Sequence, residues 1–257
     1  MDKYDKKAAE RIDRSYLTPE IVNQRLCTLR ALALTRGESV LDAGCGTGLL
    51  LEQEALAVGA EGRAVGIDSS ADMLDLARRR CADLSQLELH EGSVENLPFE
   101  DASFDALSST QCLLYVPDLY SALREFERVL KPGGRIAILE TEWSGAIMHS
   151  HDQSLTQRIF DAWDLGQANP HLPMRLRPML TALGFGALRV EAIPILNASY
   201  CENSFSASMM RNYASGAQKH GRISAAEAEE WLSGIDELIQ QDSYFFCVNR
   251  FLFTAVK

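Results

Sequence analysis

The chain has 257 residues, of which 46% are hydrophobic and 24% charged, as in soluble globular proteins, so fibrous and disordered classes are excluded. Its 36 Asp and Glu against 25 Lys and Arg give a net charge of −11, which argues against a nucleic-acid substrate because the phosphate backbone is also negative. No segment approaches the ~20 apolar residues of a membrane span, residues 1–14 do not resemble a secretory signal, and no CxxC pair is present, so we expect a cytoplasmic protein with reduced thiols.

The first half alternates short apolar runs with helical patterns, which is typical of a parallel sheet with crossover helices. Strands are predicted at 38–43, 62–67, 87–90, 104–109 and 135–141. Helices are predicted at 49–58, after a cap at Ser69 or Ser70, and after a cap at Asp118. The sequence Lys131-Pro-Gly-Gly134 should end the last of these helices. Five strand–helix units in a row predict an α/β, doubly wound domain.

The second half is less regular. Helices are predicted at 152–166 and 175–183, a strand at 187–196, two helical stretches within 200–241 and a final strand at 244–257. Ser224 and Glu227 form a capping box for the second of the two helical stretches. A helical insertion of roughly 40 residues between two strands is long for a compact domain, and such segments are often lids.

The most informative motif is the glycine-rich turn in Val40-Leu-Asp-Ala-Gly-Cys-Gly-Thr-Gly48. Glycines at 44, 46 and 48 allow a ligand to approach the backbone closely, next to the first amides of the following helix. Asp68 ends the second strand, where a carboxylate can bind two neighbouring ribose hydroxyls. Alternatively, such a turn only tightens a strand–helix junction.

A dinucleotide would require a third glycine at position 49, which is Leu49. In addition, Asp42 lies two residues before the first glycine, where it would repel a pyrophosphate and attract an ammonium group. An adenosine that carries an amino-acid tail and no phosphate is S-adenosylmethionine (SAM). A nicotinamide-dependent oxidoreductase is therefore disfavoured.

At these residues the chain resembles the class I SAM-dependent methyltransferases, in particular the small-molecule enzymes of ubiquinone and menaquinone biosynthesis. The resemblance covers most of residues 16–141. It is carried by the glycine-rich motif and by Val65-Gly-Ile-Asp68, Gly92-Ser-Val-Glu-Asn-Leu-Pro-Phe99, Phe104-Asp105 through Val116-Pro117-Asp118, and Leu130-Lys-Pro-Gly-Gly134.

The resemblance implies a Rossmann-like, doubly wound α/β fold with a mostly parallel seven-stranded sheet, an antiparallel last strand and helical lid insertions. We interpret residues 1–257 as one domain. It would comprise an N-terminal helical cap (1–35), a SAM-binding core (36–141), lid segments (142–186 and 197–242) and closing strands (187–196 and 243–257).

The resemblance also implies a cofactor site, with S-adenosylhomocysteine (SAH) as the product and without a metal. Gly44 and Gly46 would lie against the methionine moiety and Asp68 would bind the ribose. Ser93 stands where the family usually has Asp, so the resemblance does not extend to the carboxylate that accepts a hydrogen bond from the adenine amine. The cofactor-binding residues expected are Tyr16, Arg25, Asp42, Gly44, Cys45, Gly46, Gly48, Asp68, Ser69, Met73, Ser93, Val94, Thr110 and Gln111.

Methyl transfer from a sulfonium is a displacement that requires alignment, exclusion of water and, for a protonated nucleophile, a base. The candidates for the base lie at or after the end of the fifth predicted strand: Glu140, Glu142, His149, His151 and His171. Of these, His149, His151 and Glu140 are the ones expected to act. The expected acceptor is an aromatic, quinone-like or heterocyclic small molecule. Residues expected to contact it are Tyr115, Trp143, Trp163, His171, Tyr200, Phe205 and Met209.

Other chemistries remain as alternatives. A SAM-binding protein that does not methylate, such as a cyclase, a decarboxylase or an activating subunit, would share the same cofactor motifs. Methylation of nucleic acids or glutamine is disfavoured because Ser108-Ser-Thr-Gln-Cys112 replaces the Asn/Asp-Pro-Pro-Tyr element. Arsenic methylation is disfavoured because Cys201 and Cys247 are not paired as in that family. We expect a monomer or a homodimer without a nucleic-acid partner.

Overall fold

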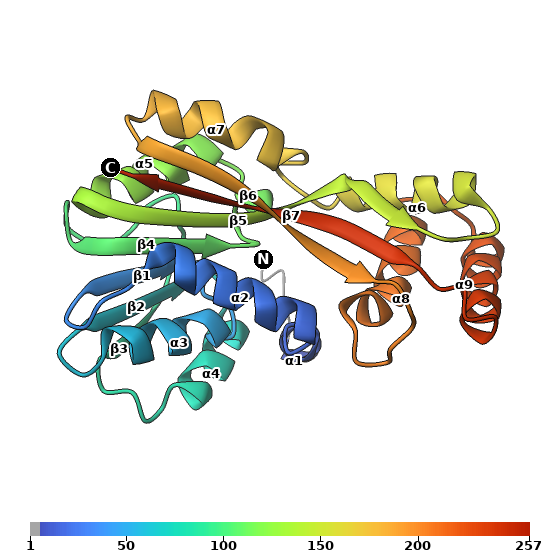
Figure 1. Cartoon of the computed structure of the whole chain (residues 1–257), viewed down its shortest axis with the longest axis horizontal. Helices are drawn as coiled ribbons and strands as arrows, with labels where there is room; N and C mark the ends of the chain where they lie inside the picture. Colours follow the sequence, from blue (N-terminus) through green and yellow to red (C-terminus); the bar gives the residue numbers. More distant parts are fainter. Residues whose placement is uncertain (1–5) are drawn as a thin grey trace.

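One seven-stranded sheet runs through the molecule, in the order β3-β2-β1-β4-β5-β7-β6 (Figure 1). The structure is a computed structural model that describes residues 6–257, so residues 1–5 of the expected cap lie outside the described residues. Strand β7 is antiparallel to both neighbours, and the other neighbouring strands are parallel, which confirms the predicted fold class. The strands are β1 (Ser39–Ala43), β2 (Arg63–Asp68), β3 (Leu87–Glu91), β4 (Phe104–Thr110), β5 (Leu130–Met148), β6 (Gly186–Asn197) and β7 (Phe246–Val256).

Helices cover both faces of the sheet. Helices α2, α3 and α4 are on one face and α5 and α7 on the other, which gives the doubly wound arrangement (Figure 1). These helices are α2 (Pro19–Leu32), α3 (Leu49–Val58), α4 (Ala71–Arg80), α5 (Leu119–Val129) and α7 (Leu172–Ala182), while α1 (Lys6–Ser15) precedes them and a short 3-10 helix, η1 (Leu113–Tyr115), follows β4. None of the helices within residues 6–257 is long and apolar enough to cross a bilayer.

The predicted helix caps are confirmed. The hydroxyl of Ser70 accepts a hydrogen bond from the Met73 amide, and Asp118 accepts one from the Ser121 amide at 3.0 Å. Ser224 and Glu227 form the reciprocal capping box that opens α9 (Ala225–Gln240). These side chains begin the helices at the predicted positions because they satisfy amides that have no partner inside the helix.

Strand β5 is longer than predicted. It was expected to end at residue 141 but continues to Met148, after an irregularity between Glu142 and Ile147. The extension is stabilised by pairing with β7, in which Ile147 lies opposite Cys247 and Met148 opposite Phe246. The first residues of the expected lid segment are therefore part of the sheet.

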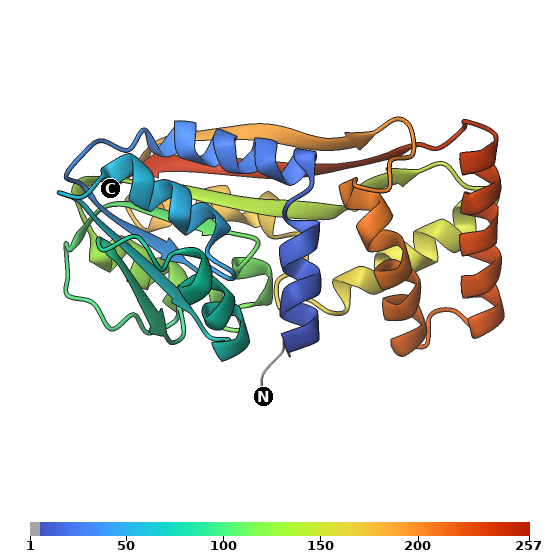
Figure 2. The same ribbon diagram turned by 90° about the horizontal axis from the view of Figure 1, so that it is seen from below.

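The long strands β5, β7 and β6 carry three helices at their far end, which we call the distal helices: α6 (Gln153–Asp164), α8 (Phe205–Lys219) and α9 (Figures 1 and 2). Helix α8 packs against both α6 and α9. Figure 2 shows α1 between the distal helices and the core helices. Helix α1 therefore contacts both α4 of the core and α8 of the distal helices.

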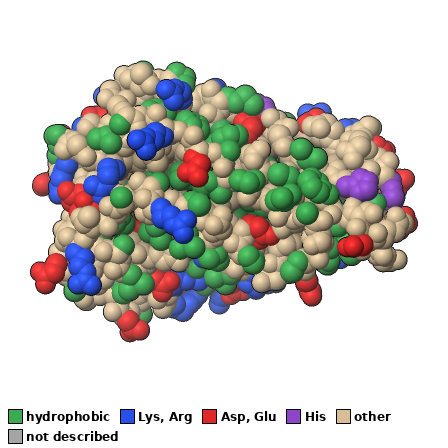
Figure 3. Space-filling view, viewed as in Figure 1, with side chains coloured by type: hydrophobic (Ala, Val, Ile, Leu, Met, Phe, Trp, Pro, Cys, Tyr) green, Lys and Arg blue, Asp and Glu red, His purple; other side chains and the backbone are tan. Residues whose placement is uncertain are grey.

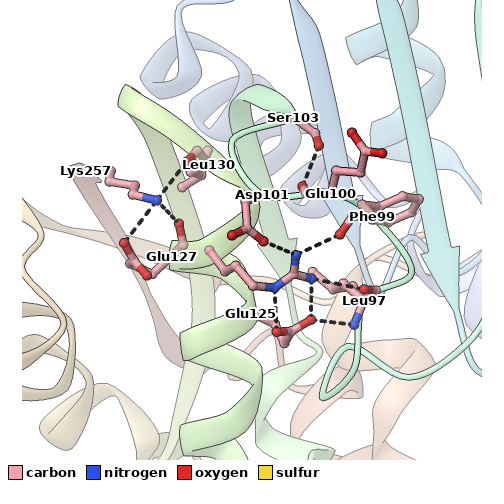
Figure 4. A network of polar contacts seen from close by, with 10 residues as sticks. Leu97, Phe99, Glu100, Asp101, Ser103, Glu125, Glu127, Leu130 and Lys257 are labelled. Carbon is pink, nitrogen blue, oxygen red and sulfur yellow. Dashed lines mark hydrogen bonds and ion pairs between the residues drawn. The ribbon is translucent and has the colours of Figure 1, made fainter.

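A polar network fixes the loop after β3 to α5 (Figure 4). The guanidinium of Arg128 forms a salt bridge with Glu125 at 2.7 Å and donates to the carbonyl oxygens of Phe99 and Leu97 at 2.7 and 3.1 Å. The ammonium of Lys257 donates to the Leu130 carbonyl at 2.9 Å. The contacts of Arg128 hold the loop that leads from residues 93 and 94 back to β4.

Candidate functional site

A cavity of about 870 Å³ opens at the carboxyl ends of β1, β2 and β4, where parallel sheets of this kind bind their ligands. The core strands and their loops form one side of it, and residues of α1, α2, α6 and α8 form the other. Among the expected cofactor residues, those that line it are Tyr16, Arg25, Asp42, Gly44, Cys45, Gly46, Asp68, Ser69, Met73, Ser93, Val94, Thr110 and Gln111. The structure thus brings together residues that are up to 95 positions apart in the sequence, from Tyr16 to Gln111.

The glycine turn allows two close approaches. At Gly44, with a φ of 85°, a Cβ atom would lie 2.4 Å from Sγ of Cys112, so the loop after β4 can pass over the turn only because no side chain is present. At Gly46, with a φ of 53°, no protein atom lies within 4 Å of the position of a Cβ. The backbone of Gly46 therefore presents an open surface to the cavity.

Gly48 has a different environment from the one expected. It does not line the cavity, and its α-carbon faces α4, where a Cβ would lie 3.0 Å from the Cβ of Ala77. Its φ of 79° is in the left-handed region that favours glycine. The third glycine therefore allows close packing of α4, and Gly48 is the one expected cofactor residue that the structure does not bring to the cavity.

Asp68 ends β2 with its carboxylate held in a fixed orientation. One oxygen accepts the Gly46 amide at 2.8 Å and the other accepts the Ser70 amide at 2.9 Å. Burial raises the pKa of Asp68, and these two amides partly counteract that rise. The carboxylate therefore links the glycine turn to the start of α4 while it lines the cavity.

Asp42 is a second carboxyl group at the cavity, and it lacks a partner for Oδ1 among the described residues. Burial raises its pKa to about 7. Glu54 of α3 is fully buried, both of its oxygens lack partners, and burial followed by the charge of Asp42 raises its pKa far above the ordinary value. A cation near Asp42 would satisfy this group and favour its ionised form.

Helix α1 is tied to the glycine turn. The hydroxyl of Thr47 donates to Asp13 of α1 at 2.6 Å, and Arg80 of α4 donates to the same carboxylate at 2.9 and 3.1 Å. Arg80 also donates to the carbonyl of Thr47. At the end of α1, the Tyr16 carbonyl accepts a hydrogen bond of 2.6 Å from Arg25, whose Nε has no partner. These bonds hold α1 over the cofactor side of the cavity.

An aromatic cluster forms the distal side of the cavity. The ring of Trp143 lies 5.6 Å from that of Trp163 and 6.5 Å from that of Phe205, and Tyr213 packs edge-on against both tryptophans. Such ring pairs are stable in offset or edge-to-face geometries. Of the residues expected to contact an acceptor, Tyr115, Trp143, Trp163, Phe205 and Met209 line the cavity.

The other expected acceptor residues lie elsewhere. His171, at the start of α7, is within 2.8 Å of Glu142 through Nδ1, and Tyr200 is exposed with its ring against Tyr244. Neither lines the cavity.

The histidines proposed as bases are distant from the cavity lining. His149 is exposed and its Nδ1 lies 2.7 Å from the Ser243 carbonyl, while His151 faces Glu237 of α9 at 3.4 Å. Figure 3 shows histidine side chains at this end of the molecule. The structure therefore does not bring these two side chains to the cavity.

Glu140 is buried and bonded to backbone amides. It is fully buried in β5, does not line the cavity, and accepts the amides of Cys112 and Leu113 at 3.1 and 2.8 Å. Burial raises its pKa to about 8. Glu140 therefore supports the loop after β4, and the expectation that it acts as a base is not met by its position.

Sequence reasoning missed Arg250 of β7, which lines the cavity and is 2% exposed. A signal was present: Phe246, Val248 and Leu252 alternate on the buried face of this strand, and Arg250 occupies the same face. A charged residue at an inward-facing strand position is unusual and marks a candidate site residue. Gln24, Asn212 and Lys219 also line the cavity and carried no comparable signal.

Comparison with known proteins identifies the central part of the chain. Residues 41–138 match the model of a methyltransferase domain. This central part of the chain is therefore similar to the SAM-dependent methyltransferases. The predicted resemblance to menaquinone-pathway enzymes is confirmed as a similarity: the demethylmenaquinone methyltransferase of Staphylococcus epidermidis is 40% identical over 113 residues, or 44% of this chain and 47% of that protein. The chain spans about half the length of the curated relatives it matches.

Solved structures share the fold of this central part of the chain and of the segments around it. The phosphoethanolamine N-methyltransferase 2 of Haemonchus contortus, solved with phosphomonomethylethanolamine and SAH, matches with a TM-score of 0.66 and 20% identity over 99% of this chain and 58% of that chain. The [4+2]-cyclase SpnF matches with a TM-score of 0.59 and 23% identity over 91% of this chain and 80% of that chain. The fold therefore occurs in proteins of both kinds, and the choice between them rests on the site.

Proposed function

We propose that the protein transfers the methyl group of SAM to a small aromatic acceptor and releases SAH. The observation that carries this proposal is one continuous cavity with two halves. One half holds Asp68, Asp42 and the open glycine turn, and the other is lined by Trp143 and Trp163.

The residues present fit SAM. The cavity volume of about 870 Å³ is near the upper end of the range for small-molecule sites, so it has room for a cofactor beside an acceptor. Oδ1 of Asp42 lacks a partner that the cofactor ammonium would supply, and Gly46 leaves space for the methionine chain. Arg25, with an unpartnered Nε on the same side, would bind the cofactor carboxylate.

The remaining cofactor contacts follow from the ends of the strands. Asp68 would accept hydrogen bonds from the two ribose hydroxyls while its other contacts keep it oriented. Met73 and Val94 would pack on the adenine. When bound, SAM supplies an electrophilic methyl group on a positively charged sulfur.

The protein contributes alignment and exclusion of water to this reaction. Trp163 of α6 and Phe205 of α8 would cover the acceptor, so we propose that α6 and α8 act as the lid. Their aromatic faces also favour a nearby cation such as the sulfonium. The six cysteines are free thiols, in keeping with a reaction in the cytoplasm.

The experiment that tests this function is a coupled assay of SAH release. The purified chain is incubated with SAM and a panel of phenols, quinols and heterocyclic amines. Turnover with an aromatic acceptor would support the proposal. Tight SAM and SAH binding without SAH release from any acceptor would favour the non-methylating alternative, and a folded protein that binds neither compound would contradict both.

A further inference from the structure

The distal half of the cavity contains a buried positive charge that lacks an ionic partner. No carboxylate within residues 6–257 lies within salt-bridge distance of Arg250. Its guanidinium donates to Oε1 of Gln24 at 2.6 Å and packs over the rings of Tyr16 and Phe205 at 5.9 and 5.2 Å, while Nε has no partner. A fully buried arginine is costly unless a ligand or a neighbouring group compensates its charge.

The titratable groups that face Arg250 do not supply this compensation. They are Tyr16, Glu140 of β5, Tyr213 of α8 and Tyr115 of η1. Burial raises the pKa values of Tyr16 and Tyr213, so both phenols are neutral near pH 7. The same cause raises the pKa of Glu140 to about 8, and the amides of Cys112 and Leu113, not Arg250, are the hydrogen-bond partners of this carboxyl.

Among the described residues that line the distal half of the cavity, the unpartnered side-chain atoms are donors. Nε2 of Gln24 and the indole N–H groups of Trp143 and Trp163 are buried at the cavity and lack partners among the described residues. Arginines line both sides of the cavity, since Arg11 of α1 and Arg25 of α2 also belong to its lining, but the carboxylates that line it among the described residues are confined to the side of the core strands. Asp42, Asp68 and Glu95 belong to β1, β2 and the loop after β3, whereas Lys219 and Arg250 lie on the side of α8 and β7. The distal half is therefore built to bind oxygen atoms that carry negative charge.

The sheet order separates this group from the cofactor. Strand β7 lies three strands beyond β1, a distance of about 14 Å at the usual strand spacing. Arg25, in contrast, lies close enough to Asp13, Glu52 and Arg80 for their charges to influence its pKa, and so is on the cofactor side. The cofactor carboxylate has a nearer partner in Arg25, which leaves Arg250 for the acceptor.

We propose that Arg250 binds an anionic oxygen of the acceptor, so that the protein is selective for aromatic compounds with an acidic hydroxyl or a carboxylate on the ring. This inference rests on the proposed function and specifies its substrate class. An acceptor hydroxyl that ionises against Arg250 loses its proton to solvent and becomes a stronger nucleophile. In the transfer itself, a bond forms between the nucleophilic oxygen or ring carbon and the methyl carbon as the carbon–sulfur bond breaks with both electrons going to sulfur. When a ring carbon is the nucleophile, the proton on that carbon then leaves to solvent as the ring becomes aromatic again.

The test uses three probes with the full chain saturated with SAH: 2-naphthoate, 2-naphthol and 2-methoxynaphthalene. The wild type should bind 2-naphthoate at least tenfold more tightly than 2-methoxynaphthalene. Arg250→Met, which keeps the unbranched apolar stem of the side chain and removes its charge, should abolish this preference and change SAH affinity by less than twofold. Arg189→Gln, which removes an exposed arginine of β6, is the matched control and should behave as the wild type.

Each other outcome overturns the inference. Equal binding of the charged and neutral probes by the wild type would overturn it. If the wild type still binds SAH in that case, the proposed function is not affected. Loss of SAH binding in Arg250→Met, with melting temperature retained, would make Arg250 a cofactor residue. Absence of SAH binding by the wild type would remove the proposed function and this inference together.

A measurement on the wild type covers the case in which Arg250→Met does not fold. The naphtholate form of 2-naphthol absorbs at longer wavelength than the neutral form, so a pH titration gives the pKa of the bound probe. The inference predicts a decrease of at least one unit relative to free 2-naphthol. An unchanged or increased value would contradict it.

Discussion

Asp13 of α1 and Arg80 of α4 form a salt bridge of 2.9 Å directly above the glycine turn. The pair is mostly buried, and the Thr47 hydroxyl donates to the same carboxylate. Helix α1 therefore closes over the proposed cofactor site through contacts between side chains that are 67 positions apart. Several consequences of the proposed site can be measured.

Removal of the Asp13–Arg80 pair should weaken cofactor binding. In Asp13→Ala we expect SAH affinity to fall by about 3- to 10-fold. Helix α1 loses charge-assisted hydrogen bonds that contribute about 1.5–3 kcal/mol, and only part of that energy orders α1 over the cofactor site. The value of kcat should change little. The control is Asp75→Ala, which breaks the exposed Arg78–Asp75 pair of α4, the helix that also carries Arg80. Equal effects of the two substitutions on calorimetric SAH affinity would contradict the role of α1.

Asp42 should couple cofactor binding to proton release. Its pKa of about 7 means that about half of the carboxyl is protonated at pH 7, and an ammonium placed beside it lowers that pKa. We expect SAH binding to release up to about half a proton, seen as a binding enthalpy that differs between phosphate and Tris buffers. Asp42→Asn should lose this buffer dependence. If the variant kept it, the assignment would be wrong.

The same group should make stability depend on pH. A carboxyl whose pKa is raised from 3.8 to about 7 binds more protons in the folded than in the unfolded chain between these values. Its contribution to the free energy of unfolding therefore decreases as pH rises from about 4 to 7. Urea denaturation at pH 5.5 and 7.5 should show a smaller loss of stability for Asp42→Asn than for the wild type. An equal loss in both proteins would show that Asp42 does not titrate in this range.

His171 should contribute in the same direction for a different reason. Its contact with Glu142 raises the pKa of the imidazole, so the fold favours the protonated form. This stabilisation is complete below pH ~6.5 and is lost as pH rises through the raised value. Because His171 is 46% exposed, we expect a contribution below about 1 kcal/mol. His171→Gln should flatten this part of the stability profile, whereas His151→Gln, at a more exposed pair, should leave it unchanged.

Substitutions at the distal side of the cavity should separate acceptor from cofactor binding. Trp163→Phe and Phe205→Leu keep most of the apolar volume, so melting temperatures should fall by only a few degrees. We expect the KM for an acceptor identified by the SAH-release assay to rise about tenfold while SAH affinity stays within twofold. Unchanged acceptor kinetics in both variants would remove these residues from the acceptor site.

Most of the core was predictable because local signals and tertiary structure agree there. The caps at Ser70 and Asp118, the glycine turn and the acidic end of β2 each follow from short-range chemistry. The cavity then forms where parallel strands end together. For this reason, residues from five separate segments, including Asp68 and Thr110, could be assigned to one site from the sequence.

The distal half was less predictable because its geometry depends on long-range pairing. The extension of β5 to Met148 is stabilised by β7, about 100 positions later, and it moves His149 and His151 away from the cavity. The same pairing turns Arg250 inward. The path of β5 does not follow from the sequence near these residues. The inward position of Arg250 is indicated only by the alternation of buried residues along β7.

The most direct test of the central claim is calorimetric titration of the wild type and Asp68→Asn with SAH. Asparagine is preferred to alanine because Asp68 also accepts the amides of Gly46 and Ser70, and an amide oxygen can keep one of these bonds. The account predicts micromolar binding by the wild type and a loss of about 10- to 100-fold in the variant at a similar melting temperature. No binding by the folded wild type, or equal affinity in the two proteins, would contradict it.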